Sequence, residues 1–74
     1  METQTGIPIV INGEPDTVPE NTTIYELLNQ KGIDPSMQGI AVAVNEEVVR
    51  RKDWSTVALK PHDRVEIITA TQGG

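Results

Sequence analysis

Three apolar segments stand out along the chain. Residues 7–11 and 40–44 are almost continuously apolar and rich in β-branched side chains, and residues 64–70 alternate less regularly between apolar and polar positions. Short segments of this composition are typical of β-strands. The pattern therefore predicts strands at these three places, and the unbroken apolar run at 40–44 indicates a strand that is buried on both faces or nearly so.

Two further strands are expected from turn signals. Asn12-Gly13 is a strong hairpin signal, because both residues tolerate a positive φ. The return strand, residues 14–18, is polar and contains Pro15, so we expect it at an edge of the sheet. A turn after the run at 40–44 predicts a short strand at 48–50.

Residues 24–31 have the pattern of a helix. Apolar side chains recur at the first, fourth and fifth positions from Ile24, which places them on one face. Thr23 and Glu26 have the spacing of a capping box, and Gly32 suits the left-handed position that follows a helix. The segment therefore predicts one helix with a single apolar stripe.

The remaining segments are less regular. Residues 51–59 show no clear period, and we expect Trp54 and Leu59 to anchor them in the core. Residues 60–63 form a predicted turn that leaves His62 exposed. A hairpin followed by one helix and further strands favours an α+β fold of the β-grasp type. We expect a mixed sheet of four to five strands, the first and last of them adjacent in the middle, with the helix packed on one face.

The amino-acid composition limits the classes of function that the chain can perform. The chain has 74 residues, which fits one domain over residues 1–74, with residues 1–6 frayed and 71–74 as a flexible tail. It has no cysteine and one histidine, so it offers no thiol nucleophile and little for a metal site or a catalytic triad. We therefore expect a carrier, modifier or binding module that binds no metal or cofactor, and not an enzyme.

Charge bears on partners and location. The net charge of −5 disfavours nucleic acid and anionic membranes as partners. No apolar run approaches the roughly 20 residues of a membrane-spanning helix, and the first residues lack the pattern of a signal peptide. We expect a cytoplasmic protein. The basic run 50–52 beside Trp54 is better explained as a solvated turn than as a nucleic-acid site.

Gly73-Gly74 is the sharpest chemical feature. Glycine has no Cβ, so two glycines can enter a narrow active-site tunnel and present a bare carboxylate. A carboxylate is a poor acyl donor until it is activated. The pair therefore favours a substrate of an ATP-dependent adenylating enzyme, while a frayed end is the alternative interpretation.

Several motifs together resemble the sulfur carrier proteins of thiamine biosynthesis, the ThiS family. The most specific is Val44-Asn-x-x-Val-Val-x-Arg51-x-x-Trp54, which is followed by His62-Asp-Arg-Val-Glu-Ile67 and then by Gly73-Gly74. The resemblance covers about residues 9–74. The turn at 61–63 departs from the family's usual Gly-Asp. The resemblance implies a ubiquitin-like β-grasp fold and a role in sulfur transfer.

The resemblance also implies partners and site residues. An E1-like adenylyltransferase would adenylate Gly74 with ATP and Mg²⁺, and a cysteine desulfurase would supply the sulfur that makes a thiocarboxylate. Thiazole synthase would then accept that sulfur. The family uses one face of its sheet to contact the adenylating enzyme, and four residues are candidates for that surface: Val42, Val44, Val65 and Ile67. Core packing explains these four equally well.

Three alternatives stay open at this point. The small subunit of molybdopterin synthase also carries a thiocarboxylate on this fold, although it is usually longer. A ubiquitin-like modifier would join Gly74 to a lysine of another protein. A passive interaction module would make no use of the two glycines.

Overall fold

The computed structural model describes residues 6–70. The described elements are, in order, β1 (Gly6–Ile11), β2 (Glu14–Pro19), α1 (Ile24–Gln30), β3 (Ile40–Val44), β4 (Glu47–Val49), a 3-10 helix (Arg51–Asp53) and β5 (Arg64–Thr69). All of the predicted strands and the predicted helix are present, and none of their ends differs from the predicted end by more than one residue. β1 begins at Gly6, one residue earlier than predicted.

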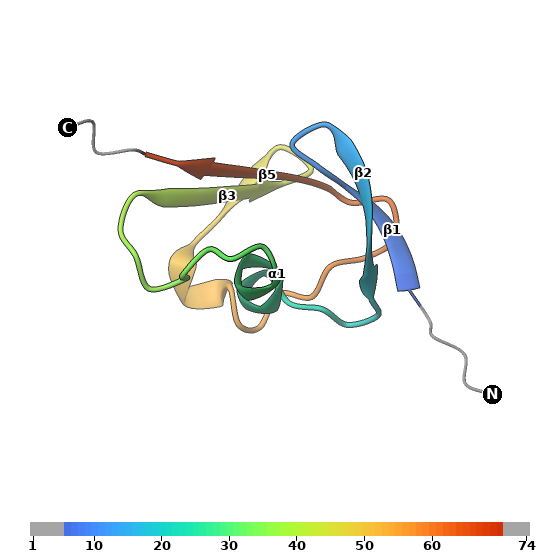
Figure 1. The fold of residues 1–74 in the computed structure, drawn as a ribbon, viewed down its shortest axis with the longest axis horizontal. Helices are drawn as coiled ribbons and strands as arrows, with labels where there is room; N and C mark the ends of the chain where they lie inside the picture. The colour runs from blue at the N-terminus through green and yellow to red at the C-terminus, as the bar shows by residue number, and fades with distance from the viewer. Residues whose placement is uncertain (1–5, 71–74) are drawn as a thin grey trace.

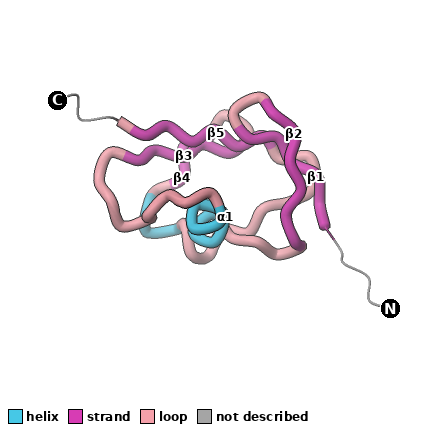
Figure 2. Tube along the Cα trace, viewed as in Figure 1, coloured by secondary structure: helices cyan, strands magenta, loops and turns pink. Residues whose placement is uncertain are grey.

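The five strands form one mixed sheet in the order β2-β1-β5-β3-β4. β1 and β5 are parallel neighbours in the middle, and the other pairs are antiparallel. The sheet lies over α1, which packs on one of its faces (Figure 1; Figure 2). The predicted β-grasp fold, with the first and last strands adjacent in the middle, is therefore confirmed.

Local sequence signals explain the first hairpin and the helix. Asn12 and Gly13 have φ values of 50° and 85°, as the hairpin turn between β1 and β2 requires. The Thr23 hydroxyl accepts a hydrogen bond from the Glu26 backbone N–H, and the Glu26 carboxylate accepts one from the Thr23 N–H, so the capping box is complete. Past the end of α1, Gly32 has a φ of 77°, in the left-handed region.

The core lies between α1 and the sheet. The helix contributes Ile24, Leu27 and Leu28, each 0% exposed. The other buried hydrophobic residues are Ile7, Ile9, Val18, Val42, Trp54, Leu59 and Val65. Aliphatic side chains thus fill most of the core, and among residues 6–70 Trp54 is its one aromatic member.

The segment without a clear period closes the molecule between β4 and β5. Its 3-10 helix positions Trp54, and Ala58 forms an isolated antiparallel bridge with Thr23 at the start of α1. Leu59 donates its backbone N–H to the Thr22 carbonyl at 2.8 Å and buries its side chain. Among residues 6–70, no helix combines the length and hydropathy that crossing a membrane requires.

Candidate functional site

The predicted modification site, Gly73-Gly74, lies outside the described residues. The structure does describe the strand that leads to it, β5, and Ala70 directly after that strand. β5 is a central strand, paired with β3 over five residue pairs from Val44↔Val65 to Ile40↔Thr69. This end of β5 is therefore the part of the candidate site whose geometry can be described.

Gly39 holds the chain just beyond β5. The Ala70 backbone N–H donates to the Gly39 carbonyl at 2.7 Å. Gly39 has a φ of 85°, and a Cβ at this position would lie 3.3 Å from the Ala70 Cβ and 3.4 Å from the Ala70 carbonyl oxygen. Both the backbone conformation and the close approach favour glycine here.

The four candidate partner residues share the helix-facing side of the sheet. Val42 and Val65 are each 1% exposed, so in this structure they offer no surface to a partner. Val44 and Ile67 are half-buried and pack against the same core. Their register explains this placement, because Val42 pairs with Ile67 and Val44 pairs with Val65, and paired residues lie on one face.

The outward face of the sheet carries different apolar residues. Ile68 is 61% exposed in β5 and Val48 is 77% exposed in β4. Between them in the sheet lie two small residues of β3: Ala41 pairs with Ile68, and Ala43 pairs with Val48. Sequence reasoning missed this surface, although the alternation of small and large residues in 40–44 is a signal for it.

The Arg51-x-x-Trp54 motif stabilises the fold. Trp54 is 2% exposed, which confirms that it is a core residue, and its indole Nε1 donates to the Val49 carbonyl at 3.0 Å. The Arg51 guanidinium carbon lies 4.6 Å from the Trp54 ring centroid. The same guanidinium donates to the carbonyls of Pro35 and, at 2.7 Å, Met37. Arg51 therefore ties the 34–39 loop, which leads to Gly39, to the buried indole.

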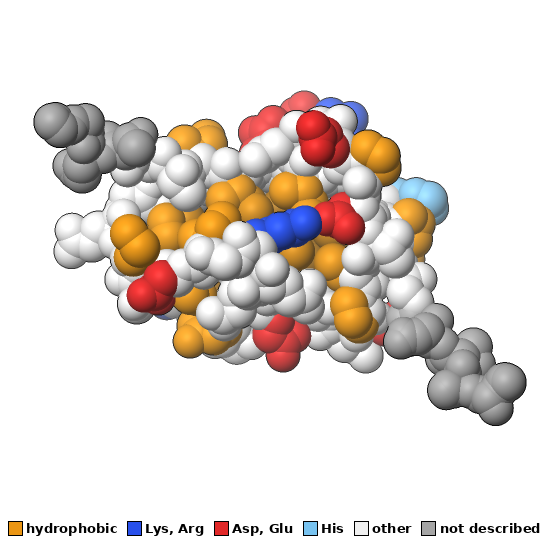
Figure 3. All heavy atoms as spheres, in the orientation of Figure 1, with side chains coloured by type: hydrophobic (Ala, Val, Ile, Leu, Met, Phe, Trp, Pro, Cys, Tyr) orange, Lys and Arg blue, Asp and Glu red, His pale blue; other side chains and the backbone are white. Residues whose placement is uncertain are grey.

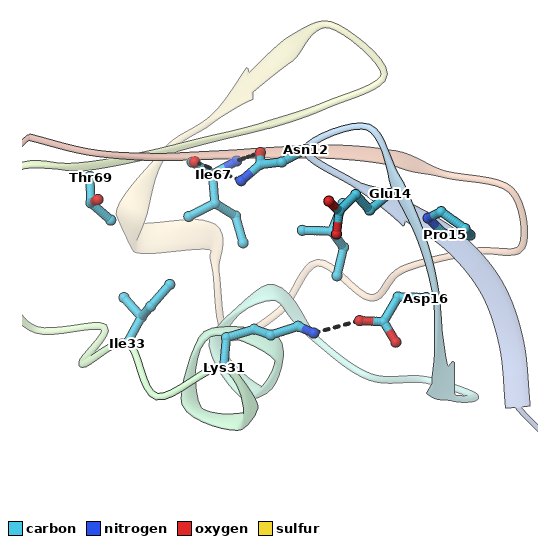
Figure 4. A pocket seen from close by; sticks show the side chains of 9 residues that line it. Asn12, Glu14, Pro15, Asp16, Lys31, Ile33, Ile67 and Thr69 are labelled. Atoms are coloured by element: carbon cyan, nitrogen blue, oxygen red, sulfur yellow. Dashed lines mark hydrogen bonds and ion pairs between the residues drawn. The ribbon is translucent and has the colours of Figure 1, made fainter.

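An open groove lies between α1 and the β1–β2 hairpin, with a cavity volume of about 430 Å³. A basic side chain crosses apolar ones on this side of the molecule and meets an acidic one (Figure 3). The close view identifies a pair in this groove: the Lys31 ammonium lies 2.5 Å from an Asp16 carboxylate oxygen (Figure 4). Ile11, Ile33 and Ile67 also line the groove. The ion pair thus joins β2 to the end of α1.

This ion pair predicts a pH dependence of stability. The hydrogen bond from Lys31, followed by that from the Thr17 backbone N–H, holds the pKa of Asp16 below its ordinary value of 3.8. A lowered pKa in the folded state stabilises the fold above the unfolded pKa and ceases to do so as pH falls through the folded pKa. Urea unfolding should show the wild type to be more stable than Asp16→Asn at pH 7. That difference should shrink as the pH falls below about 3.8.

Comparing the wild type with Asp16→Asn isolates the contribution of the Asp16 carboxylate to stability. Hydrogen bonds from Ser36 also lower the pKa of Asp34, but Asp34 is present in both proteins and its effect cancels. A stability difference that stayed constant from pH 7 to below the folded pKa would contradict the assignment.

Other candidate groups take no part in a described site. His62 is exposed with a φ of 72°, and its backbone N–H donates to the Pro8 carbonyl at 2.6 Å, so the predicted exposed turn is confirmed. Within residues 6–70, no three side chains of His, Asp or Glu are grouped as metal ligands would be.

Comparisons with known proteins agree with this geometry. A family model described as the ThiS family matches residues 9–74. The sulfur carrier protein ThiS of Thermus thermophilus is 34% identical over 64 residues, which cover 86% of this chain and 95% of that protein. The crystal structure of the thiamine biosynthesis protein ThiS from Geobacter metallireducens superposes with a TM-score of 0.76. It is 28% identical, and the match covers 92% of this chain and 100% of that one.

A second kind of relative is much longer. The thiazole synthase of Paramagnetospirillum magneticum is 33% identical over 66 residues, which cover 89% of this chain but only 20% of that protein. The chain thus spans about a fifth of the thiazole synthases that it matches. The family match covers most of the chain, and the ThiS relatives match it over nearly their full length with the same fold. This chain therefore belongs to the ThiS family, the sulfur carrier proteins of thiamine biosynthesis.

Proposed function

We propose that the carboxylate of Gly74 is the atom group on which this chain carries sulfur. An E1-like adenylyltransferase with ATP and Mg²⁺ would join that carboxylate to AMP and release pyrophosphate. Sulfide, or persulfide sulfur from a cysteine desulfurase together with a thiol reductant, would then displace AMP and leave a thiocarboxylate. The observation that carries this proposal is the family match, which extends through β5 to Gly74.

The composition of the chain supports a role in which it carries the sulfur and its partners catalyse the reactions. The sequence contains no cysteine, so the chain has no thiol on which to hold sulfur. Gly73 and Gly74 lack side chains that would obstruct a narrow active-site tunnel. The proposal gives the chain the role of a protein substrate that binds no cofactor, with catalysis, ATP and Mg²⁺ supplied by its partners in the cytoplasm.

Thiazole synthase is the proposed acceptor of the sulfur. Two proteins named thiazole synthase, from Paramagnetospirillum magneticum and Magnetococcus marinus, each contain a segment similar to 89% of this chain that makes up 20% of their length. A carrier and its acceptor that occur in one polypeptide act at high effective concentration. These relatives therefore support a functional pairing of this chain with a thiazole synthase.

The outward sheet face is the proposed contact with the adenylating enzyme. Ile68 and Val48 are exposed there, and Ile68 lies two residues before Ala70, at the end of the strand that leads to the tail. An enzyme that holds Gly74 therefore approaches this part of the sheet. Exposed apolar side chains at such a place favour a protein contact.

Methyl NMR spectra test this surface. Adding the adenylating enzyme to isotope-labelled chain should shift or broaden the methyl signals of Ile68 and Val48. The signals of Leu27 and Leu28 should change little, because they are buried under the opposite face. Perturbation confined to the core methyl groups, with Ile68 and Val48 unchanged, would place the contact elsewhere.

Growth complementation tests the proposed function. A bacterium that lacks its own thiamine sulfur carrier should grow without added thiamine when it expresses this chain, and a chain without Gly74 should not support growth. A bacterium that lacks the small subunit of molybdopterin synthase provides the matched control. Restored molybdoenzyme activity there, without growth in the thiamine test, would favour that alternative sulfur carrier.

A further inference from the structure

The two neighbours of β5 hold it unequally. β3 pairs with β5 over five residue pairs, almost to the end of the strand. β1 pairs with β5 at two positions only, the last of them Ile11↔Val65, because β1 ends at Ile11 and the chain turns away at Asn12. The last part of β5 therefore has no strand backbone beside it on the β1 side.

Ile67 directs its backbone groups to this unpaired side. Alternate residues of a strand direct their N–H and C=O groups to opposite edges. The Ala70 N–H bonds to Gly39, next to β3, whereas the Val65 carbonyl accepts the Asn12 N–H at 2.8 Å on the β1 side. Ile67 lies two residues after Val65 and directs its N–H and C=O to the same edge of β5. They therefore face the place where β1 has already ended.

The side chain of Asn12 occupies that place. Its Oδ1 accepts the Ile67 backbone N–H at 2.8 Å, and its Nδ2 donates to the Ile67 carbonyl at 3.3 Å (Figure 4). One amide side chain thus provides both the acceptor and the donor that a neighbouring strand residue would provide. It extends the β1–β5 ladder past the turn, to within three residues of Ala70.

We propose that Asn12 is a positioning residue for the reaction at Gly74, an inference that rests on the proposed function. With both Asn12 and β3 in place, the end of β5 is held from two sides, which fixes the direction of the backbone as far as Ala70. Without the amide, β3 alone holds this end. A smaller share of the bound complexes then brings the Gly74 carboxylate to the reacting phosphate, and reaction rates depend steeply on such placement.

The chain offers a closely matched control for this idea. Asn45 has a φ of 53° at a turn between strands, as Asn12 has a φ of 50°. Its side chain also makes two hydrogen bonds, from Nδ2 to Asp63 at 3.0 Å and from the Arg64 N–H to Oδ1 at 3.0 Å. These bonds hold the beginning of β5, at the opposite end from the tail. Asn12→Gly and Asn45→Gly therefore remove similar bonds, and glycine tolerates the positive φ at both positions.

ATP–pyrophosphate exchange with the adenylating enzyme provides the test, at a temperature where both variants are fully folded. Asn12→Gly should lower kcat by about tenfold and leave KM for the chain nearly unchanged. Asn45→Gly should retain the wild-type kcat. Hydrogen exchange of the free chain should show lost protection of the Ile67 amide in Asn12→Gly and retained protection in Asn45→Gly.

Several results would overturn the inference. Wild-type kcat in Asn12→Gly, an equal loss in both variants, or a change confined to KM would each show that Asn12 does not position the tail, while leaving the proposed function intact. Unchanged protection of the Ile67 amide would show that the amide does not hold β5. If the wild-type chain supported no exchange at all, the proposed function would fail and the inference with it.

Discussion

Deleting Gly74 should reduce ATP–pyrophosphate exchange by at least about 100-fold. The truncated chain still has a terminal carboxylate, now on Gly73, but that group is withdrawn by one residue, or about 3.3 Å of extended chain. A misplacement of roughly 1 Å at a reacting centre can already cost about 100-fold in rate. Exchange measured with the adenylating enzyme at saturating ATP would show the loss directly.

The control for this truncation keeps the length of the chain. Gln72→Ala changes a side chain two residues before the terminal carboxylate and should retain most of the exchange activity. Thermal unfolding of the truncated chain should match the wild type, because the buried core lies within residues 6–70. If the chain without Gly74 kept more than about a tenth of the wild-type exchange, the reaction would not depend on a carboxylate placed at Gly74.

Replacing Trp54 by alanine should lower the free energy of unfolding by about 3–5 kcal/mol. The indole is 2% exposed, receives the Arg51 guanidinium on its ring and donates to the Val49 carbonyl. Alanine removes both of these contacts together with the buried ring, and it leaves a cavity in a small core. Urea unfolding followed by circular dichroism measures the loss without depending on tryptophan fluorescence.

Replacing Trp54 by phenylalanine separates the contribution of the buried ring from that of the indole hydrogen bond. Trp54→Phe keeps a buried ring beneath Arg51 but cannot donate to the Val49 carbonyl, and such a lost bond costs about 1–3 kcal/mol. The phenylalanine variant should therefore lie between the wild type and the alanine variant. An alanine variant destabilised by less than about 1 kcal/mol would contradict a structural role for the motif.

Local signals made much of the fold predictable. Asn12-Gly13, the Thr23–Glu26 capping box and Gly32 each act within a few residues, so their conformations follow from the sequence alone. The strand order depended on a wider argument, that a lone helix must cover one face of a sheet. Residues 51–59 show no period in the sequence, and their course is fixed by backbone contacts with the start of α1 and the residue before it, such as the Thr23↔Ala58 bridge.

The partner surface was harder to predict for a physical reason. Residues 40–44 are apolar at every position, and Ile67 is followed directly by Ile68, so hydropathy does not show which residues face the helix, and the alternation of small and large residues in 40–44 is the one local signal. The pairing register between β3 and β5 decides it, and that register is a tertiary property. The bonds from Asn12 to Ile67 join residues 55 apart in sequence, and no local pattern predicts them.

Intact-mass spectrometry tests the sulfur carrier proposal most directly. The chain is incubated with its adenylating enzyme, ATP, Mg²⁺, a cysteine desulfurase, cysteine and a thiol reductant. Exchange of one carboxylate oxygen for sulfur should raise the mass of the chain by about 16 Da. The increase should appear only when ATP is present, because the exchange proceeds through the acyl-adenylate. Fragmentation should place the added mass on Gly74. An unchanged mass, or adducts linked to lysine without the sulfur-bearing species, would contradict the proposal.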